Sequence, residues 1–201
     1  MTEDLVRSVG ADRVLETSRC LLRHPEGSDV CRALDAFASQ SFPREVPLGQ
    51  LSCPQQVLKW IEGAQARWAE GSAYTWTVVR KSDHVLVGQV SLSRMADPGR
   101  WALAFWTHPE CWGEGYATEA AQRIVEFAFG ELHGTVVWAG AARWNRTSRH
   151  VLKRLGMVHV SDNAGGYVIQ GIPIPTKEFE ITREMWQRRS REPQRGADPA
   201  R

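Results

Sequence analysis

Two glycines one residue apart, Gly113 and Gly115, separate an apolar, aromatic-rich run from a segment with helical periodicity. Because glycine lacks a Cβ atom, the backbone there can turn several N–H groups toward one point. The first N–H groups of a helix have no partner within the helix and carry the positive end of its dipole, so they favour an anion such as a phosphate. The pattern predicts a strand, a phosphate-binding turn and a helix. Because Gly-x-Gly is a short pattern, a plain turn without a ligand is the alternative.

The residues on both sides of the glycines agree with this prediction. Residues 101–107 form an apolar run typical of a buried strand, and Pro109 ends it because proline has no N–H to donate. Residues 135–141 predict a second strand, and the segment from Asn145 predicts a short helix that Gly156 ends. Between these strands, one helical face carries Ala117, Ala120, Ala121, Ile124, Val125 and Ala128.

The upstream half predicts two helices and a hairpin. One helix begins at Ser28 and Asp29, and a loop covers residues 39–50. The second helix follows Ser52-Cys53-Pro54-Gln55, an S-x-x-Q capping pattern with proline in the first turn. Residues 74–80 and 85–92 then predict a β-hairpin. The apolar face of the second helix consists of Val57, Trp60, Ile61, Ala64 and Trp68.

Composition narrows the class of protein. The chain has 201 residues, of which 42% are hydrophobic and 24% charged, as in an ordinary globular domain. A net charge of +2 is too small to indicate a protein that binds nucleic acid. No segment approaches the roughly 20 consecutive apolar residues that a membrane-spanning helix needs. The start lacks the pattern of a signal sequence, so we expect a cytoplasmic protein. Four cysteines without close spacing predict neither a disulfide framework nor a metal site.

Three segments resemble the GNAT superfamily of acetyl-CoA-dependent N-acetyltransferases, in the RimJ/RimL-type branch of ribosomal-protein N-terminal acetyltransferases. They are residues 108–120, Asn145 with Ser148, and residues 151–157. Residues 15–23 are similar to the opening strand of the family, residues 86–90 to its third strand, and residues 182–186 to its last strand and exit, so the likeness spans roughly residues 15–186.

The resemblance implies an α+β fold with a central, mixed, mostly antiparallel twisted sheet of about seven strands and about four flanking helices. Strand 4, which is the Trp101 strand, carries a bulge in the family and separates from strand 5 in a V shape. We expect a single domain over residues 1–186 and a polar, disordered tail over residues 187–201.

The same resemblance implies that acetyl-CoA lies in the V-shaped slot as acyl donor, without a metal. His108 also fits a structural bend before Pro109, Asn145 fits a helix N-cap, and Arg149 fits a solvent-exposed position. The implied cofactor contacts come from Trp106, Thr107 and His108 of the strand, from Gly113, Glu114, Gly115, Tyr116, Ala117 and Thr118 of the turn, and from Asn145 and Arg149.

Catalysis in this family is direct transfer of the acetyl group to a primary amine through a tetrahedral intermediate. The catalytic candidates are Ser148, which would protonate the leaving thiolate, and Asn145, which would bond the pantetheine arm; a serine in a helix also commonly faces solvent. Ala102 stands where many members carry a basic glutamate, so water would carry the proton away from the amine. Phe42, Arg44 and Glu45 are candidates for acceptor contact, with a plain surface loop as the alternative.

Two classes of function follow. The first is an enzyme acetylating a protein N-terminus, such as that of a ribosomal protein, or a small-molecule amine, as a monomer or homodimer without nucleic-acid or membrane partners. The second is a non-catalytic or sensory acyl-CoA-binding module, suggested by Ala102.

Overall fold

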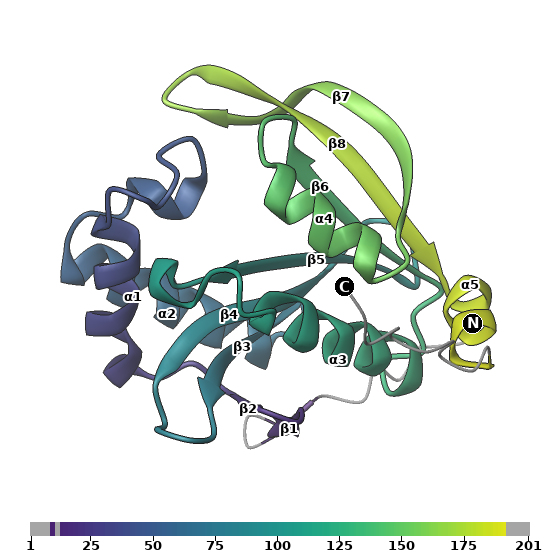
Figure 1. Cartoon of the computed structure of the whole chain (residues 1–201), viewed down its shortest axis with the longest axis horizontal. Helices are drawn as coiled ribbons and strands as arrows, with labels where there is room; N and C mark the ends of the chain where they lie inside the picture. Colours follow the sequence, from purple (N-terminus) through teal and green to yellow (C-terminus); the bar gives the residue numbers. More distant parts are fainter. Residues whose placement is uncertain (1–8, 11–12, 192–201) are drawn as a thin grey trace, which may run out of the picture.

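The computed structural model describes residues 9–10 and 13–191, and these form one twisted sheet with helices packed on it (Figure 1). The eight strands have the order β1-β2-β3-β4-β5-β6-β8-β7, and every neighbouring pair is antiparallel except β5 and β6. The strands are β1 Leu15–Glu16, β2 Cys20–Arg23, β3 Ala73–Arg80, β4 Leu86–Arg94, β5 Arg100–Thr107, β6 Val136–Ala142, β7 Val158–Ile169 and β8 Ile172–Thr182.

The described residues contain five α-helices. α2 packs on β3, α1 packs on α2, and α3 packs on β4 and β5. Figure 1 shows α3 and α4 on the side of the sheet that faces the viewer. The helices are α1 Val30–Ala38, α2 Pro54–Ala69, α3 Tyr116–Gly130, α4 Arg146–Arg154 and α5 Arg183–Arg191.

The mixed, mostly antiparallel sheet of the predicted fold class is confirmed, with three differences in detail. The opening segment 15–23 forms two short strands, β1 and β2, because residues between them reverse the chain, which raises the strand count to eight. Thr182 ends β8, and residues 183–186, expected as the exit from the last strand, begin the helix α5. α5 continues to Arg191, so residues 187–191 of the expected tail are helical, and the rest of that tail lies outside the described residues.

The helix ends follow from their sequences. Gly156, at φ +85°, follows the last turn of α4, as its position after the apolar residues predicts. The N-cap of α2 is Cys53, and Pro54 occupies the first turn. The backbone N–H of Ser52 donates to the side chain of Gln56, so the expected S-x-x-Q pattern is displaced by one residue.

One large core lies between α3 and the sheet. Its biggest fully buried side chains include Trp68, Tyr74, Trp76 and Phe127, whose rings meet at 4.8–5.3 Å in edge-to-face pairs. A smaller cluster joins α1, α2 and the loop between them. Among the described residues, no helix has the length and apolar character needed to cross a bilayer.

Candidate active site

The sheet opens between β5 and β6. These parallel strands pair only from Arg100 to Ala102 against Val136 to Trp138, and beyond that point they diverge (Figure 1). β5 remains paired with β4 from Trp101 to Thr107, so residues 103–107 have no strand partner on the side of the opening. At the end of this edge, the carbonyl of Thr107 accepts the indole N–H of Trp112 at 2.8 Å. The predicted V-shaped slot is confirmed. The β4–β5 register is continuous, so the expected bulge in β5 is wrong for this pairing, and the register shift lies between Val78 and Val79 of β3.

The double-glycine turn lies at the N-terminus of α3 beside this slot. Gly113 and Gly115 have φ values of +81° and +84°, in the left-handed region that glycine adopts without steric cost. Among the described residues, the N–H groups from Gly113 to Thr118 donate to no acceptor, and residues 112–115 are exposed. A Cβ built on Gly113 would meet nothing within 4 Å. The turn therefore has unpaired backbone donors within the described residues, and the space beside Gly113 is open.

Glu119, in the first turn of α3, holds the other side of this turn. Its carboxylate accepts from the backbone N–H of Arg19 at 2.9 Å, from Arg19 Nε at 2.7 Å and from Ser18 Oγ at 3.0 Å. Burial opposes its ionisation, but hydrogen bonds from Thr17, Arg19 and Ser18 outweigh burial and lower the pKa of Glu119 to about 2. The Glu119 carboxylate, which anchors Ser18 and Arg19 to α3, is therefore ionised at every physiological pH.

The start of α4 lies across the slot from β5. Asn145 Oδ1 accepts the backbone N–H of Ser148 at 2.9 Å, which makes Asn145 the N-cap of α4. Ser148 and Arg149 are half-buried. The Nε of Arg149 is buried and has no hydrogen-bond partner among the described residues, as is also true of the Nε atoms of Arg32 and Arg100.

His108 has a structural role at the end of β5. Its side chain is 2% exposed, Nδ1 accepts the N–H of Glu110 at 3.3 Å, and Nε2 lies 3.0 Å from the Asp35 carboxylate. Its N–H donates to Val87 and its carbonyl accepts from Cys111, so both backbone groups are engaged within the protein. This geometry supports the structural bend and leaves the His108 N–H unavailable to a ligand.

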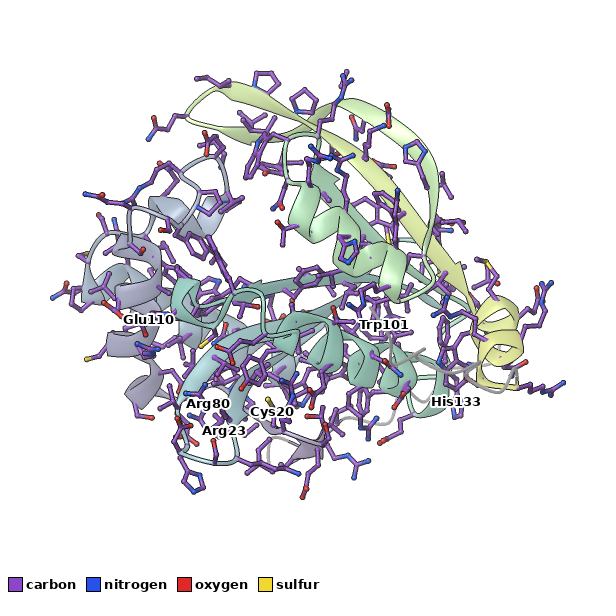
Figure 2. The ribbon with its side chains drawn as sticks, viewed as in Figure 1. Cys20, Arg23, Arg80, Trp101, Glu110 and His133 are labelled. Atoms are coloured by element: carbon purple, nitrogen blue, oxygen red, sulfur yellow. The ribbon has the colours of Figure 1, made fainter. Side chains whose placement is uncertain are left out.

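Glu110 faces away from the slot. Figure 2 shows it beside α1, where its carboxylate lies 2.7 Å from the Arg32 guanidinium. Cys111, next to it in the chain, is 3% exposed, and burial raises the pKa of its thiol. A buried, protonated thiol is a poor nucleophile, so nothing here favours acyl transfer through Cys111.

A buried polar chain supports Trp106 at the slot edge. The indole N–H lies 3.4 Å from Gln89 Oε1, Gln89 donates to the Thr77 hydroxyl at 3.1 Å, and Thr77 donates to Asp29 at 2.7 Å. Arg23 completes the chain with two hydrogen bonds to the Asp29 carboxylate. The Trp106 ring, packed 4.8 Å from Phe37, is therefore held in a fixed orientation.

Comparison with known proteins decides the family. The family model described as an acetyltransferase (GNAT) domain matches residues 19–158. The chain belongs to the GNAT acetyltransferase family. It is 24% identical to the uncharacterised N-acetyltransferase YoaA of Bacillus subtilis over 171 aligned residues. The alignment covers 85% of this chain and 97% of YoaA.

Solved GNAT structures share the fold. RimJ of Mycobacterium smegmatis, in complex with CoA-disulfide, superposes with a TM-score of 0.77 at 17% identity, covering 86% of this chain and 88% of that chain. The ribosomal-protein-S5-alanine acetyltransferase of Vibrio fischeri superposes with a TM-score of 0.73 at 18% identity, covering 87% and 99%. The resemblance noted in the sequence is confirmed: the protein is a GNAT N-acetyltransferase, a class that uses acetyl-CoA.

Besides the slot between β5 and β6, this GNAT domain has a hollow where the hairpin of β7 and β8 approaches the loop between α1 and α2. This hollow has a volume of about 500 Å³. Gln170 of the hairpin donates to Gln50 of the loop at 2.7 Å and ties the two walls together. Burial, and then the charge of Glu45, raise the pKa of Tyr167 of β7, and Glu45 itself lines this hollow. The lining residues are Arg44, Glu45, Gly49, Gln50, Ser52, Ile169, Gln170, Ile172 and Ile174.

The three loop residues predicted to contact an acceptor lie in different environments. Glu45 is exposed and lines the hollow. Phe42 is 5% exposed and packs against the rings of Phe37 and Trp106, so it belongs to the small core cluster and does not line the hollow. Arg44 also lines the hollow, but its guanidinium donates to three backbone carbonyls, including that of Gly49 at 2.9 Å, and so fixes the loop.

Sequence analysis missed two parts of the site. The hairpin residues of the hollow have a signal, because β-branched residues flank Gly171, which has φ +80° in the turn between β7 and β8. The contact of Arg19 with the glycine turn has none, since the two are about a hundred residues apart in sequence. Among the described residues, no group of three or more His, Cys, Asp or Glu side chains is placed to hold a metal, and the four cysteines are free.

Proposed function

We propose that this GNAT enzyme transfers the acetyl group of acetyl-CoA directly to a primary amine that enters from the hollow between the α1–α2 loop and the β7–β8 hairpin. The observation that carries the proposal is the turn from Gly113 to Thr118, whose N–H groups have no acceptor among the described residues and lie at the N-terminus of α3, with open space beside Gly113. These donors and the helix dipole suit the diphosphate of acetyl-CoA. Tyr116, Ala117 and Thr118 contribute the first-turn amides, and Glu114 contributes its backbone.

The remaining donor contacts follow the slot. The edge of β5 that faces the slot near Trp106 and Thr107 suits the amides of the pantetheine arm, as an added strand would pair. The Thr107 carbonyl on this edge is already bonded to the indole N–H of Trp112, so the arm would pair with the remaining backbone groups. On the far side, the Asn145 side-chain oxygen is used in the N-cap, and its amide nitrogen has no partner within the described part of the chain. The unpartnered Nε of Arg149 suits a phosphate or carbonyl oxygen.

The chemistry requires a neutral amine, a stabilised oxyanion and a proton for the departing sulfur. Ser148 is half-buried at the first turn of α4 and is the proposed proton donor. β5 carries Ala102 where a side-chain base would stand, so water removes the proton of the amine. An α-amine with a pKa of about 8 needs less help than a lysine at about 10.4, which favours an N-terminal amine or a weakly basic small amine.

The acceptor end supports the same class of substrate. Glu45 places a carboxylate in the hollow, which attracts an ammonium group, and Ile169, Ile172 and Ile174 offer apolar contact to the rest of the acceptor. This combination fits a peptide N-terminus with an apolar neighbour or a small apolar amine. The solved neighbours named for ribosomal-protein acetylation give the peptide a reason to be tested first.

The test is thiol release from acetyl-CoA in the presence of an amine panel: ribosomal-protein N-terminal peptides, polyamines, lysine peptides and small apolar amines. We expect turnover with an N-terminal or small apolar amine, and a large loss in Ser148→Ala. Tight acetyl-CoA binding without thiol release for any amine would instead identify a non-catalytic acyl-CoA-binding module. Failure to bind acetyl-CoA would refute the proposed site.

A further inference from the structure

Arg19 reaches the glycine turn from the chain reversal between β1 and β2. Its Nη1 donates to the backbone carbonyl of Glu114 at 3.0 Å, and its Nε donates to Glu119 at 2.7 Å. The guanidinium also lies 4.4 Å from the centre of the Tyr116 ring. One side chain thus contacts the middle residue of the Gly113–Gly115 turn, the first residue of α3 and the anchoring carboxylate of its first turn.

The carbonyl that Arg19 binds fixes the direction of a donor. In a planar trans peptide, the C=O of one residue and the N–H of the next point in opposite directions. The described residues contain no cis peptide, so the Gly115 N–H points away from Arg19. Both flanking glycines have left-handed φ values and lack side chains that could fix this peptide plane. The other contacts of Glu114 and Gly115 hold the Glu114 side chain, 4.0 Å from Arg80, and the Gly115 carbonyl, which accepts from Glu119 at 3.1 Å.

We propose that Arg19 is a positioning residue that sets the plane of the 114–115 peptide, so that the Gly115 N–H points at the diphosphate of acetyl-CoA. This inference rests on the proposed function, because that function places the diphosphate at the turn. Arg19 itself is held at its backbone, where its N–H donates to Glu119 and its carbonyl accepts from Lys81 at 2.9 Å. The support therefore runs from the turn between β3 and β4 through Arg19 to the glycine turn.

The chemistry requires arginine. Its planar guanidinium donates in two directions at once and stacks on an aromatic face, whereas lysine has a compact ammonium group that cannot do all three. Arg80, labelled near Cys20 in Figure 2, lies farther from the Tyr116 ring, at 5.9 Å, and its guanidinium pairs with Asp83. It also lies 4.0 Å from the side-chain carboxylate of Glu114, but Arg19 is the arginine that bonds the backbone carbonyl of that residue.

Arg19→Lys tests the proposal, with Arg13→Lys as the matched control. Arg13 also ties the N-terminal part of the chain to α3, but through Glu131 at the far end of that helix, at 2.5 Å. We expect Arg19→Lys to raise the KM for acetyl-CoA about tenfold and to leave kcat at saturating acetyl-CoA and the KM for the amine within twofold. Arg13→Lys should leave all three unchanged.

An equal KM for acetyl-CoA in wild type and Arg19→Lys would overturn the proposal, as would a parallel rise in both KM values. A readout without ligand separates this inference from the proposed function. We expect the backbone ¹³C′ shift of Glu114 and the ¹⁵N shift of Gly115 to change in Arg19→Lys and to stay unchanged in Arg13→Lys. If these shifts stay at their wild-type values, Arg19 does not set the peptide plane, whatever the protein binds. If they change in a protein that does not bind acetyl-CoA, only the proposed function fails.

Discussion

Replacing Gly113 by alanine separates backbone strain from loss of the ligand. Gly113 has φ +81°, and an L-residue in the left-handed region costs about 1–2 kcal/mol. Because a Cβ there meets nothing within 4 Å, no clash adds to that cost. The same Cβ enters the space assigned to the diphosphate, and losing one hydrogen bond to a charged group, worth about 1.5–3 kcal/mol, weakens acetyl-CoA binding about tenfold to a hundredfold.

Gly171 provides the matched control. It has φ +80°, a Cβ there also meets nothing within 4 Å, and it lies in the turn between β7 and β8. Gly113→Ala and Gly171→Ala should therefore lose similar stability without ligand. Acetyl-CoA at about 100 times the wild-type Kd should stabilise wild type and Gly171→Ala by about 2.7 kcal/mol. The same concentration should stabilise a Gly113→Ala protein with a hundredfold weaker Kd by only about 0.4 kcal/mol.

Thermal unfolding with and without acetyl-CoA measures both effects. For a chain of this length, about 2.7 kcal/mol corresponds to a rise of roughly 5–10 °C in Tm. We expect that rise in wild type and Gly171→Ala, and about 1 °C in Gly113→Ala. Equal ligand-induced rises in the two variants would refute the assignment of the diphosphate to this turn.

Four further predictions address the supports and the chemistry of the site. Thr77→Val interrupts the buried hydrogen-bond chain behind the slot and should lower the free energy of unfolding in urea by about 2 kcal/mol, whereas Thr75→Val on the same strand should change it by much less; equal losses would contradict the role of the chain. The lowered pKa of Glu119, about 2 against an ordinary 4.5, predicts that Glu119→Gln costs about 1 kcal/mol, after allowance for solvent screening, above about pH 4.5. That cost should shrink as the pH falls below 4.5 and vanish below about 2, and urea unfolding that shows a constant difference across this range would exclude it. Ser148→Ala should lower kcat by one to two decades with an unchanged Kd for acetyl-CoA, and an unchanged kcat would remove Ser148 from the mechanism. Glu45→Gln should raise the KM for the amine several-fold and leave the KM for acetyl-CoA unchanged in steady-state kinetics, and the reverse pattern would move the acceptor elsewhere.

Local rules predict much of the fold around the slot. Three features depend only on residues within one or two helical turns of each other: the glycine turn, the apolar face of α3 and the end of α4 at Gly156. They can therefore be predicted from one sequence without knowledge of distant contacts. The chain reversal that splits 15–23 into β1 and β2 is a tertiary choice, because the same apolar pattern fits one longer strand.

The candidate site was less accessible from sequence wherever it depends on distant contacts. Asn145 fits both an N-cap and an amide that bonds a ligand, and its oxygen, but not its nitrogen, is bonded to a described residue in the folded protein. Phe42 is an aromatic residue of a type common in ligand pockets, yet its packing against Phe37 and Trp106 buries it. The bond from Arg19 to Glu114 joins segments that no periodicity relates.

The most direct test of the account is a crystal structure of the protein with acetyl-CoA. We expect diphosphate oxygens at about 2.7–3.2 Å from the amide nitrogens of Gly113 to Thr118, and the thioester in the slot between β5 and β6. A diphosphate bound elsewhere, with those amides still facing solvent, would contradict the central claim.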